Sequence, residues 1–193
     1  MDYDAGTALI VVDVQNDFAD PNGSLYVPGG DEILPVVNRA IDEARAADAL
    51  VVYTQDWHPP DTPHFEKDGG IWPVHCVKES WGAELHPDLK VVGEIVRKGT
   101  RGEDGYSGFT VRDPASGDEE STQLERILRA RDIEKIVVVG LATDYCVKAT
   151  AVDAAGKGFP TVVLEEGIRA VNREPGDDEQ ALEEVRRAGV VIE

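Results

Sequence analysis

The sequence predicts an α/β protein, with a mostly parallel sheet and helices packed on both of its faces. Two observations predict this fold. Short, continuous apolar runs recur along the 193 residues, and such runs are typical of strands that are buried on both faces. Segments with apolar residues at helical spacing separate them, and this alternation gives parallel strands joined by right-handed crossovers. No internal repeat or interdomain linker interrupts residues 1–193, which we expect to form a single domain.

Six apolar segments are predicted to form the strands of the sheet. The first ends in an acid, Asp13, and the third leads directly into Lys98. The fourth, Ile-Val-Val-Val-Gly-Leu, has the clearest strand pattern. In chain order, the predicted strands are residues 7–13, 49–55, 91–97, 136–141, 161–164 and 190–192.

Four helices are predicted from apolar residues at helical spacing. The first extends to about Ala47, because Ile33, Val37 and Ile41 recur every four residues, and Asp31 is its expected N-cap. The other three are, in chain order, residues 124–131, residues 143–157 and a segment around Leu182 and Val185.

Two long segments show no periodicity and are predicted as loops. Residues 56–87 contain prolines, glycines, tryptophans and all four histidines of the chain, and residues 99–120 are polar and glycine-rich. Irregular segments of this length are uncommon in a compact domain and usually carry function. We therefore expect both loops to contribute to a functional site.

The chain is strongly acidic, with 38 aspartate and glutamate residues against 19 lysine and arginine residues and a net charge of −19. This charge disfavours nucleic acid and anionic lipid as partners and is typical of a solubilising surface. No apolar run is long enough to span a membrane, and the N-terminal residues carry acid rather than the basic flank of a secretion signal. The expected location is the cytoplasm, where the two cysteines would not form a structural disulfide.

Chemically reactive side chains follow several of the predicted strands. Asp13 ends the first strand, Asp56 follows the second, Lys98 ends the third, and residues 142–146 follow the fourth. Parallel strands bind ligands at the edge formed by their carboxyl ends, where the strand order reverses. The sequence therefore predicts that these residues meet in one site.

Cys146 stands just after a buried strand and at the opening of a predicted helix. The free N–H groups and partial positive charge of a helix N-terminus would favour the nucleophilic thiolate and could hold an oxyanion. A small buried cysteine that packs the helix against the sheet is an equally good interpretation of its position alone.

Asp13 and Lys98 are the expected partners of this thiol. Apolar neighbours make Asp13 partly buried, which raises a carboxyl pKa and suits a proton acceptor, although an acid at a strand end can also cap a turn. A surface role is the common one for a lysine, but Lys98 ends an apolar strand and precedes a glycine. Near Asp13 and Cys146, its charge would stabilise both negative groups.

The loop 56–87 contains a candidate metal site. Asp56 and His58 lie two residues apart, on one side of an extended chain, and His64 and His75 follow in the same loop. A carboxylate with imidazoles suits one divalent transition metal ion, namely zinc, iron or manganese. His86, which precedes a proline, is expected on the surface. Cys76 is expected to be packed rather than reactive.

The sequence resembles the nicotinamidase/pyrazinamidase branch of the isochorismatase-like cysteine hydrolases, with matching motifs in the family's order over nearly the whole chain. DVQNDF, starting at Asp13, and GLATDYC, ending at Cys146, match the wider family. The Asp-x-His pair at 56–58, His64 and the Trp-Pro-x-His motif ending at His75 match this branch. Members that hydrolyse isochorismate lack the cysteine. The remaining matches are Gly29-Gly30, Arg97-Lys98-Gly99 and Tyr106-Ser-Gly-Phe109.

The resemblance implies a three-layer α/β/α fold with about six strands, and an enzyme of NAD salvage that hydrolyses nicotinamide and pyrazinamide. Cys146 is implied as the nucleophile, Asp13 as the general base and Lys98 as its partner. The N–H groups of Ala142 and Cys146 are the implied oxyanion hole, and the bond from Leu141 to Ala142 is implied to be a cis peptide. The implied metal ligands are Asp56, His58, His64 and His75, and the implied pocket residues are Phe18, Trp72, Tyr106 and Leu141.

Two other functions are compatible with parts of this pattern. A related cysteine amidase acting on a carbamoyl or ureido substrate would share the cysteine chemistry but generally lacks the metal-ligand set. A catalytically inert metal-binding module would not need Asp13, Lys98 and Cys146 together. The sequence leaves open whether the chain is a monomer or a homo-oligomer.

Overall fold

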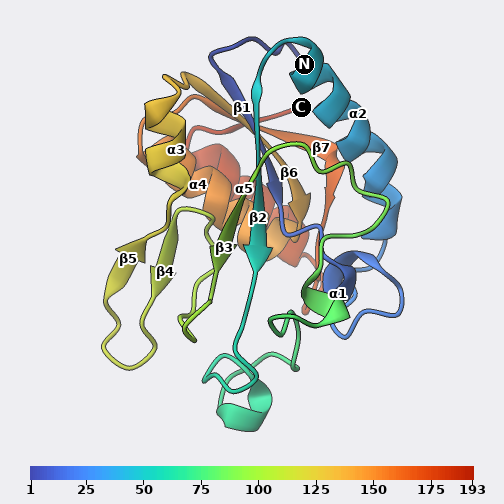
Figure 1. The fold of residues 1–193 in the computed structure, drawn as a ribbon, viewed down its shortest axis with the longest axis vertical. Helices are drawn as coiled ribbons and strands as arrows, with labels where there is room; N and C mark the ends of the chain where they lie inside the picture. The colour runs from blue at the N-terminus through green and yellow to red at the C-terminus, as the bar shows by residue number, and fades with distance from the viewer.

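The computed structural model describes residues 1–193 and contains a six-stranded sheet in which all neighbouring strands are parallel (Figure 1). The strand order is β3-β2-β1-β6-β7-β8, so the order reverses between β1 and β6. All six predicted strands are present, and the predicted α/β class is confirmed. Their bounds are Thr7–Val12 (β1), Leu50–Asp56 (β2), Glu94–Lys98 (β3), Lys135–Leu141 (β6), Thr161–Arg169 (β7) and Val191–Ile192 (β8).

Helices cover both faces of this sheet, with α2 on one side and α3, α4 and α5 on the other (Figure 1). Residues of β1 alternate between the faces, so that Leu9 packs on the side of α2 and Ile10 on the opposite side. Each face buries a cluster of 21 residues. The helices are Asn16–Ala19 (α1), Leu34–Ala46 (α2), Leu124–Ala130 (α3), Lys148–Gly156 (α4) and Asp177–Arg187 (α5).

The start of α2 differs from the prediction. A short 3₁₀ turn, η1 (Asp31–Ile33), precedes the helix, and no side chain caps either element. The carboxylate of Asp31 instead accepts a hydrogen bond from the hydroxyl of Tyr26. The expectation that Asp31 caps the helix is therefore wrong, because this acid stabilises the preceding loop.

Two further segments depart from the prediction. Residues 99–120 are not wholly a loop, because β4 (Thr110–Arg112) and β5 (Glu119–Ser121) form an antiparallel hairpin. The helix predicted from residue 143 begins as a five-residue π-helical turn, η4 (Thr143–Val147), before α4. Strand β7 also continues beyond its predicted end, since an irregularity in β6 lets the pairing resume at Ile168.

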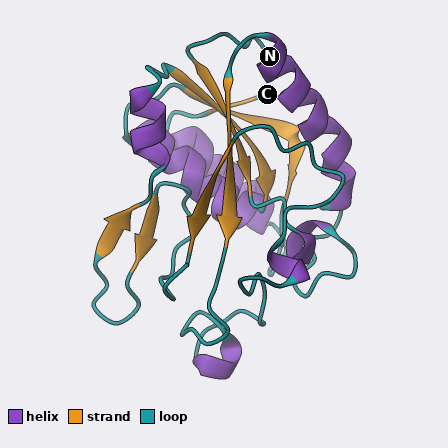
Figure 2. Ribbon diagram, in the orientation of Figure 1, coloured by secondary structure: helices purple, strands orange, loops and turns teal.

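The loop after β2 lies at the carboxyl edge of the sheet, where the long connections gather (Figure 2). It contains two short 3₁₀ turns, η2 (Glu66–Asp68) and η3 (Trp81–Ala83), and is otherwise irregular. No helix in the structure has the length and apolar character that a membrane crossing requires.

The register of the strands fixes which residues meet at this edge. Asp56 pairs with Lys98 across β2 and β3, and Val12 pairs with Gly140 across β1 and β6. Gly140 has a φ of 117°, and a Cβ atom there would lie 2.1 Å from the carbonyl oxygen of Val12. Glycine is therefore required where β6 approaches β1, next to the segment that leads to Cys146.

Candidate active site

Asp13 occupies the first position after β1 and is completely buried. Its φ of 47° turns the chain sharply out of the strand. One carboxylate oxygen accepts a 2.6 Å hydrogen bond from the hydroxyl of Thr54, and the other lies 2.9 Å from the Nζ atom of Lys98. Burial raises the pKa of Asp13 above its usual range, and the opposing effect of Lys98 does not cancel the increase. A raised pKa makes this carboxylate a better proton acceptor than an ordinary aspartate.

Lys98 is buried at the end of β3, so the surface alternative is wrong for this residue. Its Nζ atom contacts the carboxylates of Asp13 and Asp56 and lies 3.6 Å from the Sγ atom of Cys146. Burial alone would lower the pKa of Lys98, but the two carboxylates raise it well above its usual value. The lysine therefore stays charged and compensates the negative groups around it.

Cys146 lies in η4 and is nearly buried, with its thiol facing the two carboxylates. Its Sγ atom and one oxygen each from Asp13 and Asp56 lie within 4.8 Å of one another. Burial raises the pKa of the Cys146 thiol well above its usual value, and the opposing effect of Lys98 does not cancel this increase. The thiolate that the helix position was expected to favour is disfavoured in this structure, because burial of the thiol is the largest influence on its pKa. A base must remove the thiol proton.

The backbone just before Cys146 carries potential oxyanion donors. The peptide bond from Leu141 to Ala142 is cis, as the resemblance implied. The N–H groups of Tyr145 and Val147 both donate to the carbonyl of Ala142. The N–H of Ala142 itself donates to no group in the chain. This donor is free to bind a ligand oxygen beside the thiol.

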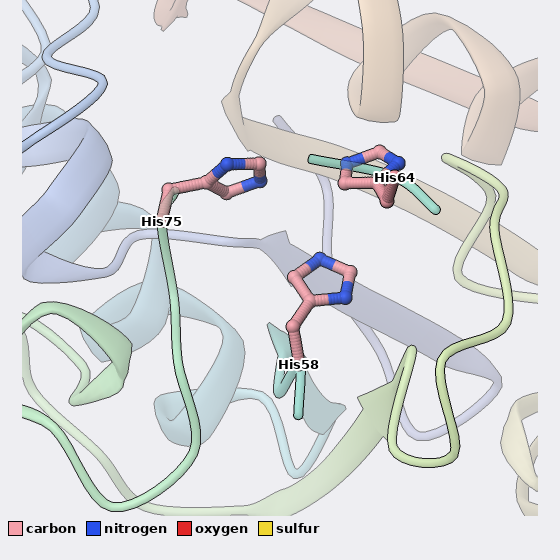
Figure 3. Close-up of side chains that lie close together, drawn as sticks. All are labelled: His58, His64 and His75. Carbon is pink, nitrogen blue, oxygen red and sulfur yellow. The ribbon is translucent and has the colours of Figure 1, made fainter. Parts of the chain in front are cut away.

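Three of the four histidines converge beside these residues, and Figure 3 shows their rings facing a common centre. His58 follows β2, whereas His64 and His75 come from the irregular loop. The ring centroid of His58 lies 4.8 Å from that of His64 and 5.3 Å from that of His75. One ring nitrogen from each residue lies within 4.8 Å of the others. We call these three residues the histidine cluster.

The hydrogen bonds of the histidine cluster fit a metal ion. The Nδ1 atom of His75 lies 2.7 Å from the carbonyl oxygen of Pro73, which can only accept, so Nε2 keeps its lone pair. Both ring nitrogens of His58 are buried without a hydrogen-bond partner. A buried polar atom without a partner is costly, and a metal ion would satisfy the Nε2 atom. Imidazoles with a carboxylate suit zinc, iron or manganese.

Asp56 belongs to both parts of the site. One of its carboxylate oxygens contacts Lys98, and the other lies 3.8 Å from the Nε2 atom of His58. Burial would raise the pKa of Asp56, but Lys98 and His58 lower it below the usual range. The carboxylate is therefore ionised, as a metal ligand must be.

The fourth histidine lies apart from the cluster. His86 is buried, so its expected surface position is wrong. Its backbone N–H donates to the carbonyl of Val14, and its Nδ1 atom accepts from the N–H of Asp88. The loop is therefore hydrogen-bonded to the segment that follows β1. Cys76 is completely buried, which agrees with the expectation that it is packed.

A pocket lined by both Cys146 and two members of the histidine cluster, His64 and His75, joins the thiol to that cluster. Its lining is mostly apolar and includes the four residues expected from the sequence, Phe18, Trp72, Tyr106 and Leu141. The Nε1 atom of Trp72 donates to the hydroxyl of Tyr106, which fixes both rings. Cys146, Asp56, His64 and His75 supply its polar atoms. A small aromatic ring that carries one polar substituent matches this lining.

Several residues that shape the site were not predicted. Gln15 is completely buried, and its side-chain amide bonds both the N–H and the carbonyl of Asp56. Asp144 accepts hydrogen bonds from the N–H groups of Val171 and Asn172, and Val171 lines the pocket. The partners of Gln15 and Asp144 are 41 and at least 27 residues away in the sequence, so no local pattern marks these contacts.

Comparisons with known proteins give consistent matches over the whole chain. The family described as "Isochorismatase domain" matches residues 7–193. A nicotinamidase/pyrazinamidase of Mycobacterium tuberculosis is 40% identical, covering 96% of this chain and 97% of that protein. The pyrazinamidase of Pyrococcus horikoshii in complex with zinc is 41% identical, with a TM-score of 0.87 and coverage of 97% and 98%. PnC1 of L. infantum in complex with nicotinate is 36% identical, with a TM-score of 0.90 and coverage of 100% and 95%.

Proposed function

Because the chain belongs to the isochorismatase-domain family, we propose that it is a metal-dependent nicotinamidase of NAD salvage. It hydrolyses nicotinamide, and also pyrazinamide, to the carboxylic acid and ammonia. The observation that carries this proposal is the position of Cys146 beside a buried Asp13–Lys98 pair, in a mostly apolar pocket that also opens onto the histidine cluster. Related proteins bound to zinc and to nicotinate support it.

The first half of the proposed reaction forms a thioester. Asp13 takes the proton of the Cys146 thiol, and the thiolate attacks the carboxamide carbon. The N–H groups of Ala142 and Cys146 hold the tetrahedral oxygen. Asp13 then returns the proton to the leaving nitrogen, and ammonia departs. Lys98 balances the negative charge that passes between the acid and the thiol.

The second half of the reaction frees the enzyme. Asp13 accepts a proton from a water molecule, whose oxygen attacks the thioester carbon. The bond to sulfur breaks, nicotinate leaves, and the proton returns to Cys146. The raised pKa of Asp13 suits both directions of this transfer. The same two groups therefore serve both halves of the cycle.

Asp56, His58, His64 and His75 are the proposed ligands of one divalent zinc, iron or manganese ion. When bound, this ion would supply a Lewis acid that coordinates the pyridine nitrogen. Phe18, Trp72, Tyr106 and Leu141 hold the ring by packing against it. The carboxamide is then presented to the sulfur, and such positioning can contribute several kcal/mol to catalysis.

We also propose that the protein is located in the cytoplasm.

The test is ammonia release from nicotinamide by purified protein, with elemental analysis of the same sample. We expect turnover, together with about one equivalent of a transition metal per chain. An N-carbamoyl amino acid serves as the comparison substrate. Hydrolysis of that compound without hydrolysis of nicotinamide would replace the proposal with the carbamoyl amidase alternative.

A further inference from the structure

The histidine cluster contains one contact that the mechanism does not use. The Nδ1 atom of His64 lies 2.8 Å from a carboxylate oxygen of Asp104. The two residues are 40 positions apart, and Asp104 belongs to the second long loop. His64 is nearly buried, whereas the Asp104 side chain is one-third exposed. The acid therefore approaches the histidine cluster from its outer side.

The backbone of Asp104 is fixed by the hairpin that the sequence did not predict. Its N–H donates to the carbonyl of Arg112 at 2.8 Å, and its carbonyl accepts from the N–H of Arg112 at 2.7 Å. Arg112 is the last residue of β4. The N–H of Gly105 donates to the same Asp104 oxygen that faces His64. The carboxylate thus has a defined position even though it is partly exposed.

A second contact ties the same two loops together. The hydroxyl of Thr62 donates to the carbonyl of Gly102, and the N–H of His64 donates back to that hydroxyl. The segment that carries His64 contains no helix or strand at that residue. The position of His64 therefore depends on residues 99–105. Of these contacts, only the hydrogen bond between Nδ1 and the Asp104 carboxylate involves the imidazole ring.

The chemistry of this bond decides which nitrogen of His64 is free. An ionised carboxylate can only accept a hydrogen bond, so Nδ1 carries the proton. The lone pair is then on Nε2. The rings of His58 and His75 lie 4.8 and 5.3 Å away from His64, centroid to centroid. In metal sites, a ligating histidine often donates the N–H of its other ring nitrogen to a carboxylate. This hydrogen bond fixes the tautomer of the histidine and makes it a stronger ligand.

The three histidines differ in this respect. The Nδ1 atom of His75 faces a neutral carbonyl, and the Nδ1 atom of His58 has no partner. Only the Nδ1 atom of His64 faces a carboxylate. We propose that Asp104 is a positioning residue that holds His64 in the tautomer and orientation of a metal ligand. This inference rests on the metal site of the proposed function and adds the residue that makes His64 part of it.

The test measures metal binding without substrate. Metal-free protein is titrated with zinc against a competing chelator, using wild type, Asp104→Ala, His64→Ala and the double variant. We expect Asp104→Ala to raise the zinc Kd by about 10- to 100-fold, as for other partners of ligating histidines. In the His64→Ala background the same change should have less than about a twofold effect, because the ring through which it acts is gone.

Two further variants separate this role from charge and folding. Asp61→Asn removes the same charge from the same region, where the side chain is exposed and pairs with Lys67, and should leave the zinc Kd within about twofold. Asp104→Asn keeps a hydrogen-bond acceptor for Gly105 and His64, and its loss of affinity should be smaller than that of the alanine variant. Thermal unfolding of the metal-free variants checks that each one folds.

The inference is overturned if Asp104→Ala binds zinc as wild type does, or if it loses the same factor with and without His64. An equal loss in Asp61→Asn would also overturn it, since the effect would then be one of net charge. If wild type takes up no zinc, the metal site of the proposed function fails along with the inference. If wild type binds zinc and the two substitutions act additively, only the role of Asp104 is lost.

Discussion

The two halves of the site are built in different ways. Asp13, Lys98 and Cys146 follow or end strands of one sheet, and their positions depend on the register of β1, β3 and β6. His64 and His75 lie on an irregular loop that is held by hydrogen bonds to distant segments. The first group compensates its own charges, whereas His58 has two buried nitrogens without partners. The catalytic half is thus complete within the chain, and the histidine half needs a ligand.

This contrast separates chemistry from substrate positioning. The covalent steps would take place in the half fixed by the sheet, and recognition of the ring would take place in the half fixed by loops. Asp56 is the residue common to both, since it contacts Lys98 on one side and faces His58 on the other. If the division is correct, substitutions in one half should leave the measured property of the other half intact.

The largest effect is expected for Cys146→Ala. Loss of the nucleophile should lower kcat/KM for nicotinamide by at least about a thousandfold, whereas metal content and folding should not change. Ammonia release and elemental analysis measure the two properties on one sample. Residual activity above about a thousandth of wild type would indicate a metal-hydroxide mechanism. It would also contradict the separation of the covalent chemistry from the histidine cluster.

The next effect concerns the substrate rather than the protein. Benzamide has the shape of nicotinamide but no ring nitrogen, so it cannot use the histidine half. Its kcat/KM should be about a hundredfold lower, which corresponds to about 2.7 kcal/mol of transition-state stabilisation. Pyrazinamide, which keeps the nitrogen, is the control and should remain a good substrate. Similar values for benzamide and nicotinamide would remove the anchoring role but leave the Cys146 chemistry intact.

His58→Ala and His75→Ala should each lower metal affinity, by about 10-fold or more, and raise the KM for nicotinamide. The physical reason is that the remaining ligands must bind the ion with one fewer donor. His86→Ala is the matched control, because His86 is also buried but lies outside the histidine cluster. A variant that kept full metal content and normal kinetics would remove its histidine from the ligand set.

The smallest expected effect is a difference in labelling rate between the two cysteines. Iodoacetamide should modify Cys146 before Cys76, because Cys146 lines the pocket and Cys76 is completely buried. Burial raises the pKa of both thiols, so the rate should increase as the pH rises and the thiolate fraction grows. Peptide mass spectrometry measures the order of modification. Earlier labelling of Cys76 would contradict the assignment of the reactive thiol.

The sequence predicted the sheet well because apolar strands and amphipathic helices carry a periodic signal. The hairpin was not predicted because β5 is Glu-Glu-Ser, an exposed segment without apolar alternation. In the folded chain, β5 pairs with β4, and Glu120 forms an exposed ion pair with Arg101. These interactions depend on the folded chain, so no local pattern could indicate them.

The site was predictable to the extent that it follows from strand ends. Asp13 and Lys98 could be placed together because parallel strands end at the same edge of a sheet. The burial of His86 and the contact between His64 and Asp104 depend instead on how two long loops pack. The thiolate expected at Cys146 is disfavoured in the structure, since the sequence does not reveal how completely the thiol itself is buried.

The raised pKa of Cys146 also bears on how readily its sulfur is oxidised. Peroxide attacks the thiolate, and stepwise oxidation to sulfinic and sulfonic acids ends in forms that most cells cannot reverse. A resting thiol that stays protonated is a poor target for this reaction. If Asp13 removes the thiol proton in each cycle, as we propose, that proton also protects the sulfur from oxidants between turnovers.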